Sequence, residues 1–148
     1  MPNWCDNELF IYGAPEEVAQ LAVLVRSSDE NAFCFNKVIP IPADVNLKAS
    51  EGWYAWSIKH WGTKWNVDNV VPMRSLDSVE YHFSTAWAPP IPVIKKLMEM
   101  FPDLYFRLRY VEPGVGYAGE LTNESHEEGP YQENAWAHAR YPSDEDGG

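Results

Sequence analysis

The stretch HWGTKWN, residues 60–66, gathers side chains that can hold a small ligand. Aromatic rings stack on flat ligands, hydroxyl and amide groups exchange hydrogen bonds with them, and an ammonium group attracts a phosphate or carboxylate. The stretch supplies the aromatic rings of Trp61 and Trp65. Thr63 and Asn66 supply the hydroxyl and amide groups, and Lys64 supplies the ammonium group. These groups together suit an anionic aromatic ligand such as a nucleotide, or the bases of a single-stranded nucleic acid.

The same stretch has a structural interpretation, which the sequence leaves open. Tryptophan side chains bury large apolar surfaces, so Trp61 and Trp65 would equally well belong to the protein core. In the ligand-binding interpretation we expect Glu112 to be the counter-ion of Lys64. In the structural interpretation these two residues form an internal ion pair. The choice between the ligand-binding and the structural interpretation depends on the helices and strands that position these residues.

The periodicity of apolar residues predicts a small α+β domain. Alternating spacing marks strands, and spacing of three and four residues marks amphipathic helices. The predicted strands are residues 5–12, 33–42, 79–87 and 105–113, and the predicted helices are residues 14–28 and 92–101. The order strand, helix, strand, long loop, strand, helix, strand is that of the ferredoxin-like split βαβ fold. We therefore expect an antiparallel sheet with two helices on one face.

Two segments extend this core. Residues 43–77 are a long aromatic insertion, in which EGWYAWSIKHWG predicts a short helix. Residues 116–123 and 131–141, separated by an acidic loop, predict a C-terminal β-hairpin extension. The first and third strands of a split βαβ sheet are central neighbours, so their ends meet. We expect Trp4 and Trp87 to lie there, with HWGTKWN folded over the same end of the sheet.

Length and charge limit the classes of function. The 148 residues, of which 45% are apolar, predict a single domain over residues 1–148 with an acidic tail at residues 143–148. The 22 acidic and 11 basic residues give a formal charge of −11, which opposes binding to phosphate backbones. No apolar window approaches the ~20 residues that span a bilayer, and the amino terminus has no signal-peptide pattern. We expect a cytoplasmic protein without membrane contact.

Motifs for cofactors and metals are weak. GVGYAG, residues 114–119, matches G-x-G-x-x-G, but the strand-like ELTN follows where a dinucleotide site needs a helix. His126 and the neighbouring glutamates are typical of a solvated acidic loop rather than a metal site. Cys5 and Cys34 lack the paired spacing of zinc ligands, which favours buried free thiols. We predict no cofactor, no metal and no catalytic side chain.

The amino terminus offers one alternative chemistry. If Met1 is removed, Pro2 becomes a terminal secondary amine, and such a group can act as a base or nucleophile near neutral pH. A small enzyme that uses Pro2 or an aromatic pocket is therefore a second hypothesis. Its structural alternative is that MPNW anchors the start of the chain through Trp4.

Five blocks carry a resemblance to a known family. MPNWCDN, HWGTKWN, FSTAWAPP, FPDLYF and YVEPGVGYAG occur in this order between residue 1 and about residue 120. Taken together they resemble the YubB ferredoxin-like family of conjugative-plasmid and phage proteins. The resemblance implies a ferredoxin-like fold and an origin on a mobile genetic element, and it implies no particular biochemical activity.

Our leading functional hypothesis is a noncatalytic binding or interaction protein of a phage or plasmid. Its partner would be a host protein, such as a defence protein, or a small anionic aromatic ligand that serves as a nucleotide signal. The acidic surface would engage a basic partner in the host cytoplasm. A small enzyme is the second hypothesis and a single-stranded nucleic-acid binder the third. An open sheet edge or face would also allow a homodimer.

Overall fold

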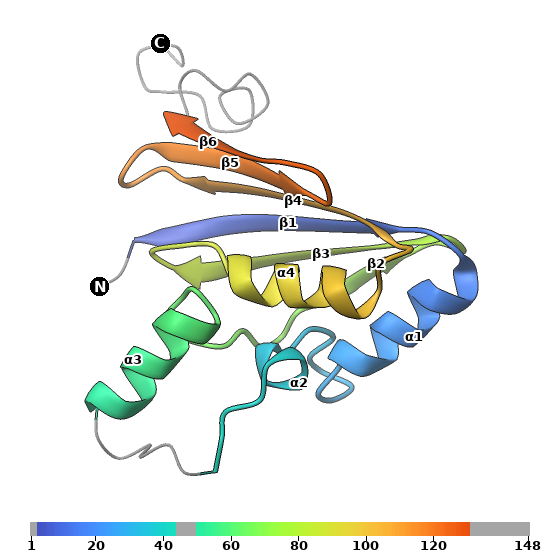
Figure 1. The fold of residues 1–148 in the computed structure, drawn as a ribbon, viewed down its shortest axis with the longest axis horizontal. Coiled ribbons are helices and arrows are strands. Elements are labelled where there is room, and N and C mark those ends of the chain that lie inside the picture. Colours follow the sequence, from blue (N-terminus) through green and yellow to red (C-terminus); the bar gives the residue numbers. More distant parts are fainter. Residues whose placement is uncertain (1–2, 44–49, 131–148) are drawn as a thin grey trace.

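The fold is seen in a computed structural model, which describes residues 3–43 and 50–130. Six strands form one antiparallel sheet in the order β2-β3-β1-β4-β5-β6 (Figure 1). The strands are β1 Trp4–Tyr12, β2 Pro72–Arg74, β3 Ser78–Ala86, β4 Tyr105–Glu112, β5 Tyr117–Thr122 and β6 His126–Pro130. The helices are α1 Pro15–Val25, α2 Phe35–Val38, α3 Ser50–His60 and α4 Ile91–Met100.

Strands β1 and β3 are neighbours at the centre of the sheet, as the sequence predicts. They pair from Trp4 opposite Ala86 to Tyr12 opposite Ser78, and the other edge of β1 pairs with β4. The order β2-β3-β1-β4, with α1 after β1 and α4 after β3, is the ferredoxin-like arrangement. The predicted α+β ferredoxin-like fold is therefore confirmed.

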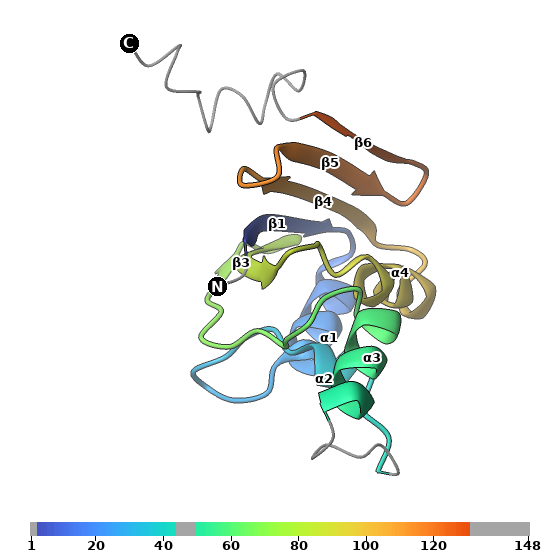
Figure 2. The ribbon, with the colours of Figure 1, turned by 90° about the vertical axis from the view of Figure 1, so that its left-hand side faces the viewer.

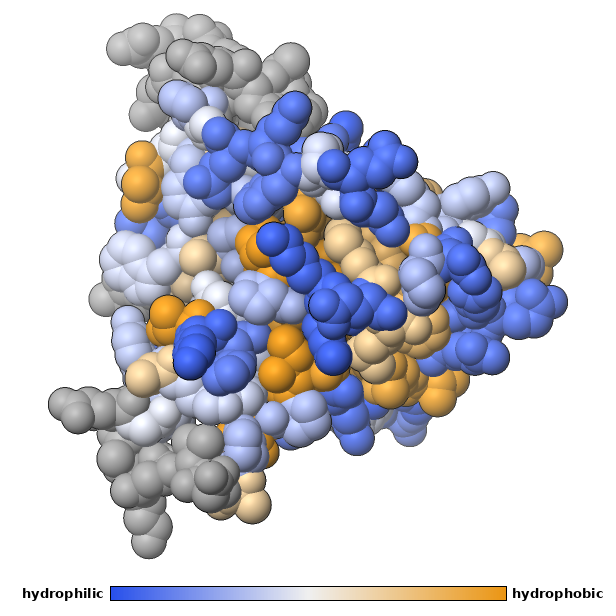
Figure 3. Space-filling view, in the orientation of Figure 1, coloured by the Kyte–Doolittle hydropathy of each residue, from blue (hydrophilic) through white to orange (hydrophobic). Residues whose placement is uncertain are grey.

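The helices cover one face of this sheet, which is where the core lies (Figure 2). Every second residue of β1 is buried on that face, including Leu9 and Ile11. The matching stripe of α1 is Val18, Leu21 and Val25, at the helical spacing that the sequence shows. Full burial of one such side chain stabilises the fold by about 1.5–3 kcal/mol, so the amphipathic stripe fixes the face of the helix. Seen from the side of α4, hydrophilic side chains cover most of the surface (Figure 3).

The predicted strand at residues 33–42 is wrong, because its centre is the short helix α2. Phe35 and Val38 are both buried, which is the spacing of one helical turn rather than of a strand. The second strand of the ferredoxin-like order is β2, which lies inside the predicted insertion and has only three residues, all exposed. The insertion also contains the predicted helix, α3. It packs on the helix side of the sheet, where Trp61 joins the core.

The C-terminal hairpin differs from the prediction in its second arm. Strand β5 pairs with β6, which is made of residues that the sequence suggests are an acidic loop. GVGYAG leads into the strand β5, as expected from the sequence. The predicted arm at residues 131–141 lies outside the described residues, as do Pro2 and the tail at residues 143–148. None of the described helices has the length and apolar character needed to cross a membrane.

A glycine in β5 makes room for a buried tyrosine. Tyr110 is fully buried, and its hydroxyl crosses to β6, where it donates to Glu128 Oε1 (2.8 Å) and contacts His126 Nε2 (2.7 Å). A Cβ at Gly119 would overlap the Tyr110 hydroxyl and lie 2.7 Å from the carbonyl oxygen of Glu127. Gly119 therefore sets the path of Tyr110 across the hairpin.

We expect Gly119→Ala to lower the free energy of unfolding by about 1–3 kcal/mol, because the added methyl group overpacks this crossing. Urea unfolding followed by circular dichroism measures the change. Gly129→Ala is the matched control, since a Cβ there meets nothing within 4 Å, and its effect should stay within about 0.5 kcal/mol. Equal effects of the two substitutions would contradict the role of Gly119.

Candidate binding groove

A groove of about 290 Å³ runs along the outer edge of β3. One wall is formed by His82–Ala86 of β3, and the other by the connection Trp65–Val70 that leads from α3 to β2. Trp4 of β1 completes the lining beside Trp65. The groove thus lies where the HWGTKWN stretch meets the centre of the sheet.

The β3 wall is open because β2 is short. Strand β2 pairs with β3 only from Pro72 opposite Tyr81 to Arg74 opposite Val79. Proline lacks an N–H group and is typical of the first residue of a strand or of an edge. No described strand pairs with the outer edge of His82–Ala86. This edge carries main-chain groups that an extended chain can pair with.

Alternation along β3 identifies the groups that face the groove. In an antiparallel strand, successive residues direct their N–H and C=O groups to opposite edges. The Ser78 carbonyl accepts from Ser75 next to β2, and the Ala86 carbonyl accepts from Thr63 Oγ1 (2.8 Å). Both are even-numbered residues on the outer edge, so the N–H and C=O groups of Ser84 also point outward.

Two asparagines hold the opposite wall away from β3. Asn66 Oδ1 accepts from the backbone N–H groups of Phe35 and Val67, each at 2.8 Å. Asn31 Oδ1 accepts from the N–H of Val70 (3.1 Å), and its Nδ2 donates to the carbonyl of Val67 (3.2 Å). The bonds to Phe35 and Asn31 tie the connection to the start of α2 and to the turn before it instead of to the sheet edge. Asn66 therefore shapes the groove, and its amide oxygen is committed to the protein backbone.

Two tryptophans stand at the rim. The rings of Trp4 and Trp65 are 6.1 Å apart and tilted by 36°, and they are 47% and 39% exposed. Lys64 Nζ lies 4.6 Å from the ring centroid of Trp65 and 5.3 Å from that of Tyr54. A cation over aromatic faces is favourable and stiffens both partners. The fold thus gives Lys64 a packing role, and its charge remains beside the groove.

Other residues of the stretch belong to the core. Trp61 is 4% exposed, its Nε1 donates to the carbonyl of Ile39 (2.9 Å), and its ring packs edge-on against Phe35 and Trp56. Thr63 is fully buried and bonded to β3. The structural interpretation of HWGTKWN therefore describes part of the stretch, and another part faces the groove. Trp61 and Thr63 are structural, whereas Trp65 and the backbone around Asn66 line the groove.

Neither Glu112 nor Trp87 lines the groove. Glu112 is fully buried and accepts from the N–H groups of Gly114 (3.0 Å) and Val115, so it closes the turn between β4 and β5. The expected ion pair with Lys64 is wrong, since no described ion pair joins them. Trp87 has a φ of 70°, which turns the chain out of β3 and leaves its side chain 49% exposed.

A row of polar side chains follows the groove on β3. The His82 ring contacts Glu80 Oε2 (2.8 Å), and Ser84 lies two residues further on the same face. A serine nucleophile needs its proton to point at a histidine base. The Ser84 hydroxyl instead donates to Asp6 Oδ1 on β1 (2.9 Å). His82 therefore pairs with Glu80 and Ser84 with Asp6, and the two residues do not form a nucleophile and its base.

The sheet face without helices carries paired charges. Arg109 Nε donates to Glu120 Oε2 (2.7 Å) across β4 and β5, and the guanidinium of Arg107 lies 5.3 Å from the Phe10 ring centroid. Single strands of nucleic acid are bound by exposed aromatic platforms in a basic groove. Here the basic groups are occupied by neighbours in the sheet, which makes this face a less favourable binding surface than the groove.

The sequence indicated neither the β3 wall nor Asn31, and it indicated Asn66 as a ligand contact rather than as a support of the groove wall. His82 looks like an isolated histidine in a strand pattern, and Asn31 lies in a polar turn before the predicted strand 33–42. One signal is present in VVPMRS, residues 70–75, where Pro72 limits any strand to a short piece. Combined with the regular pattern of β3, this predicts that a long strand has a short neighbour and therefore an open edge.

The comparisons with known proteins show a family. The family model described as the ferredoxin-like domain in Api92-like protein matches residues 60–145, which is 86 of the 148 residues. The match covers the connection Trp65–Val70 and the β3 edge, so both walls of the groove lie inside it. No curated protein and no solved structure matches the chain. The chain therefore belongs to the family of the ferredoxin-like domain in Api92-like protein.

Proposed function

We propose that this chain is a noncatalytic binding protein that holds an extended segment of a partner protein against β3. The observation that carries the proposal is the outer edge of His82–Ala86, which pairs with no described strand and lies beside a groove with two exposed tryptophans at its rim. An unpaired strand edge recognises an extended peptide by main-chain hydrogen bonds, and neighbouring pockets select its side chains. Ser84 would pair with the peptide, and Trp4 and Trp65 would contact its apolar side chains.

Charge favours a basic segment as the partner. The chain has a formal charge of −11, and Asp68 is among the residues that line the groove. Complementary charge raises the rate of encounter and rejects acidic competitors. The rings of Trp4 and Trp65 are also suited to the stems and heads of lysine and arginine side chains. We therefore expect a peptide that alternates basic and apolar residues.

The biological setting is part of this proposal. The five blocks that resemble the YubB family support an origin on a phage or plasmid, and the partner would then be a protein of the host cytoplasm. A host defence protein is one such target. A second copy of the chain is another source of an extended edge, because two β3 edges could pair in a homodimer.

A displayed library of unstructured peptides, selected on the purified protein, tests the proposal. Selected peptides should contain basic and apolar residues, and nuclear magnetic resonance should show their largest effects at the amides of His82–Ala86. Ser84→Pro removes an outward N–H from the edge, and we expect it to weaken binding by at least about tenfold. Trp65→Ala should have a similar effect because it removes an anchor at the rim.

Trp87→Ala is the matched control, since Trp87 is as exposed as Trp4 but does not line the groove. It should leave binding within about threefold of the original chain. If no peptide is selected, or if the selected peptides ignore Ser84→Pro and Trp65→Ala alike, the proposal is wrong. Thermal-shift measurements with nucleotides, cyclic dinucleotides and short oligonucleotides, repeated on Lys64→Ala, would then identify a small anionic ligand or a nucleic acid.

A further inference from the structure

A second cavity, of about 130 Å³, lies between the end of α1 and the edge strand β2. It shares no lining residue with the groove beside β3. Its walls combine small apolar side chains with three polar ones. The lining residues are Ala22, Val23, Arg26, Ala32, Pro72, Arg74 and Tyr81.

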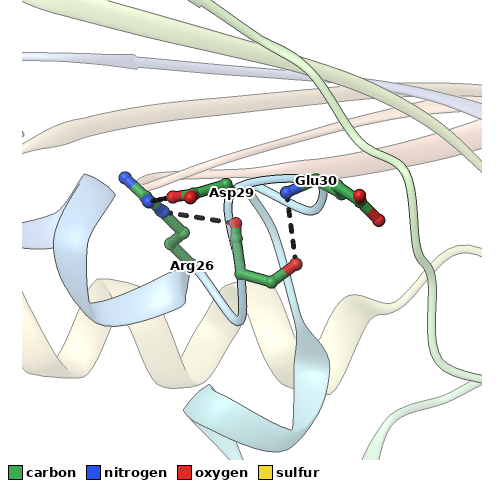
Figure 4. Close-up of polar contacts among 4 residues, drawn as sticks. Arg26, Asp29 and Glu30 are labelled. Carbon is green, nitrogen blue, oxygen red and sulfur yellow. Dashed lines mark hydrogen bonds and ion pairs between the residues drawn. The ribbon is translucent and has the colours of Figure 1, made fainter.

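The two arginines give this cavity an unusual charge for an acidic protein. Arg26, directly after α1, donates from Nε to the Ser28 carbonyl (3.2 Å) and from Nη2 to Asp29 (Figure 4). A guanidinium has five N–H donors, so this one keeps others for a ligand. Arg74 on β2 forms no ion pair with any described carboxylate. Two arginine side chains therefore line one small space.

The third polar group is a tyrosine with a buried and unpartnered hydroxyl. Tyr81 is fully buried, with its ring 5.0 Å from that of Phe33, and no described group bonds to its hydroxyl. A buried donor without a partner costs free energy, so native proteins supply one from protein, water or ligand. Burial raises the pKa of Tyr81 to about 12, against a smaller opposite effect of Arg74. The hydroxyl thus keeps its proton and is a hydrogen-bond donor.

We propose that this cavity binds the phosphate group of a small phosphate monoester. Arg26 and Arg74 contribute planar pairs of donors, and the Tyr81 hydroxyl contributes a further donor from the sheet. Two guanidinium groups and a hydroxyl supply enough donors for the several oxygens of a phosphate, and more than the two oxygens of a carboxylate need. The volume of about 130 Å³ has room for one phosphate group.

The rest of such a ligand has a place to lie. A wider depression of about 470 Å³ adjoins the cavity, shares Val23 and Arg26 with it, and is also lined by Ser27, Ser28 and Asp29. The hydroxyl and carboxylate groups there can bond to a sugar or another polar body. Arg26 lines both the cavity and the depression, so it would bind the phosphate near the oxygen that joins it to the rest of the ligand.

Calorimetric titration of the full chain tests the proposal, with inorganic phosphate, adenosine monophosphate and adenosine as separate ligands. We expect both phosphate ligands to bind and adenosine to fail. Tyr81→Phe keeps the ring and should fold as the original chain does, while its phosphate affinity falls by about tenfold. Arg74→Gln should weaken binding by at least as much, because it removes a charge-assisted pair of donors.

Lys95→Gln is the charge control, since Lys95 is an exposed residue of α4 that does not line the cavity. It should leave the affinity for phosphate unchanged. If it weakens binding as much as Arg74→Gln does, the attraction is general electrostatics and the site does not exist. Absence of phosphate binding, or binding that Tyr81→Phe leaves intact, would equally overturn the proposal. Tighter binding of adenosine monophosphate than of inorganic phosphate would place the ligand body in the adjoining depression.

Discussion

Trp61→Ala is expected to lower the free energy of unfolding by about 3–5 kcal/mol. The Trp61 ring fills the space between Phe35 and Trp56, so its removal leaves a cavity that the surrounding side chains close only in part. The substitution also removes the donor to the Ile39 carbonyl, 2.9 Å away, which leaves that acceptor without its partner. Urea unfolding followed by circular dichroism measures the loss.

Trp65→Ala is the informative comparison, because the two residues have the same side chain and stand four positions apart. Trp65 is 39% exposed and contacts Trp4 and Lys64 at the rim, so its removal should cost no more than about 1 kcal/mol. Equal destabilisation by the two substitutions would mean that Trp65 is packed in the core like Trp61 and is not available to a ligand at the rim of the groove. A large difference supports the division of HWGTKWN into a structural and a groove-lining part.

This division is not readable from the residue types. Trp61 and Trp65 have equal hydrophobicity, and the residue that separates their environments is Gly62, whose φ of 82° turns the chain after α3. A Cβ on Gly62 would lie 2.6 Å from Pro92 Cδ at the start of α4. A turn that depends on a contact with a distant element cannot be located from local sequence. The glycine itself is the visible sign that the chain changes direction there.

The fold was more predictable than the site because its main elements each bury one face. The alternation in β1 and β3 and the stripes of α1 and α4 reflect contact with a single core, so periodicity alone places them. Strand β2 has three exposed residues, which gives no periodic signal. The strand prediction for residues 33–42 was wrong for a different reason: Phe33 and Phe35 have the alternating spacing of a strand, although the chain forms a helical turn there. Phe35 is in fact held at the start of a helical turn by Asn66, 31 residues away.

The second large effect is a loss of stability in alkaline solution. Burial raises the pKa of the Cys5 thiol from 9.0 to about 12 and that of Tyr81 from 10.0 to about 12. Burial, reinforced by the carboxylate of Glu128, also raises the pKa of Tyr110. All three side chains are fully buried, so the folded chain retains protons that the unfolded chain releases at lower pH.

The sign of the effect follows from this difference in bound protons. Below about pH 8 both states are protonated at these residues and their contribution is complete. As the pH rises towards 12 the unfolded state loses protons first, so the free energy of unfolding falls. By pH 11 the loss should reach about 5 kcal/mol, on the order of the whole stability of a small domain. Urea unfolding at a series of pH values between 8 and 11 measures the curve.

Two variants test whether these buried groups cause the loss of stability. Cys5→Ala and Tyr81→Phe each remove one group with a raised pKa, and each should flatten the curve above the ordinary pKa of that group. The largest possible change in slope is one proton, or about 1.4 kcal/mol per pH unit. Tyr12→Phe is the control, because Tyr12 is 50% exposed and its removal should leave the slope unchanged. If all three variants follow the original curve, the alkaline loss comes from elsewhere in the chain, and the protonated Tyr81 hydroxyl on which the phosphate cavity depends loses its support.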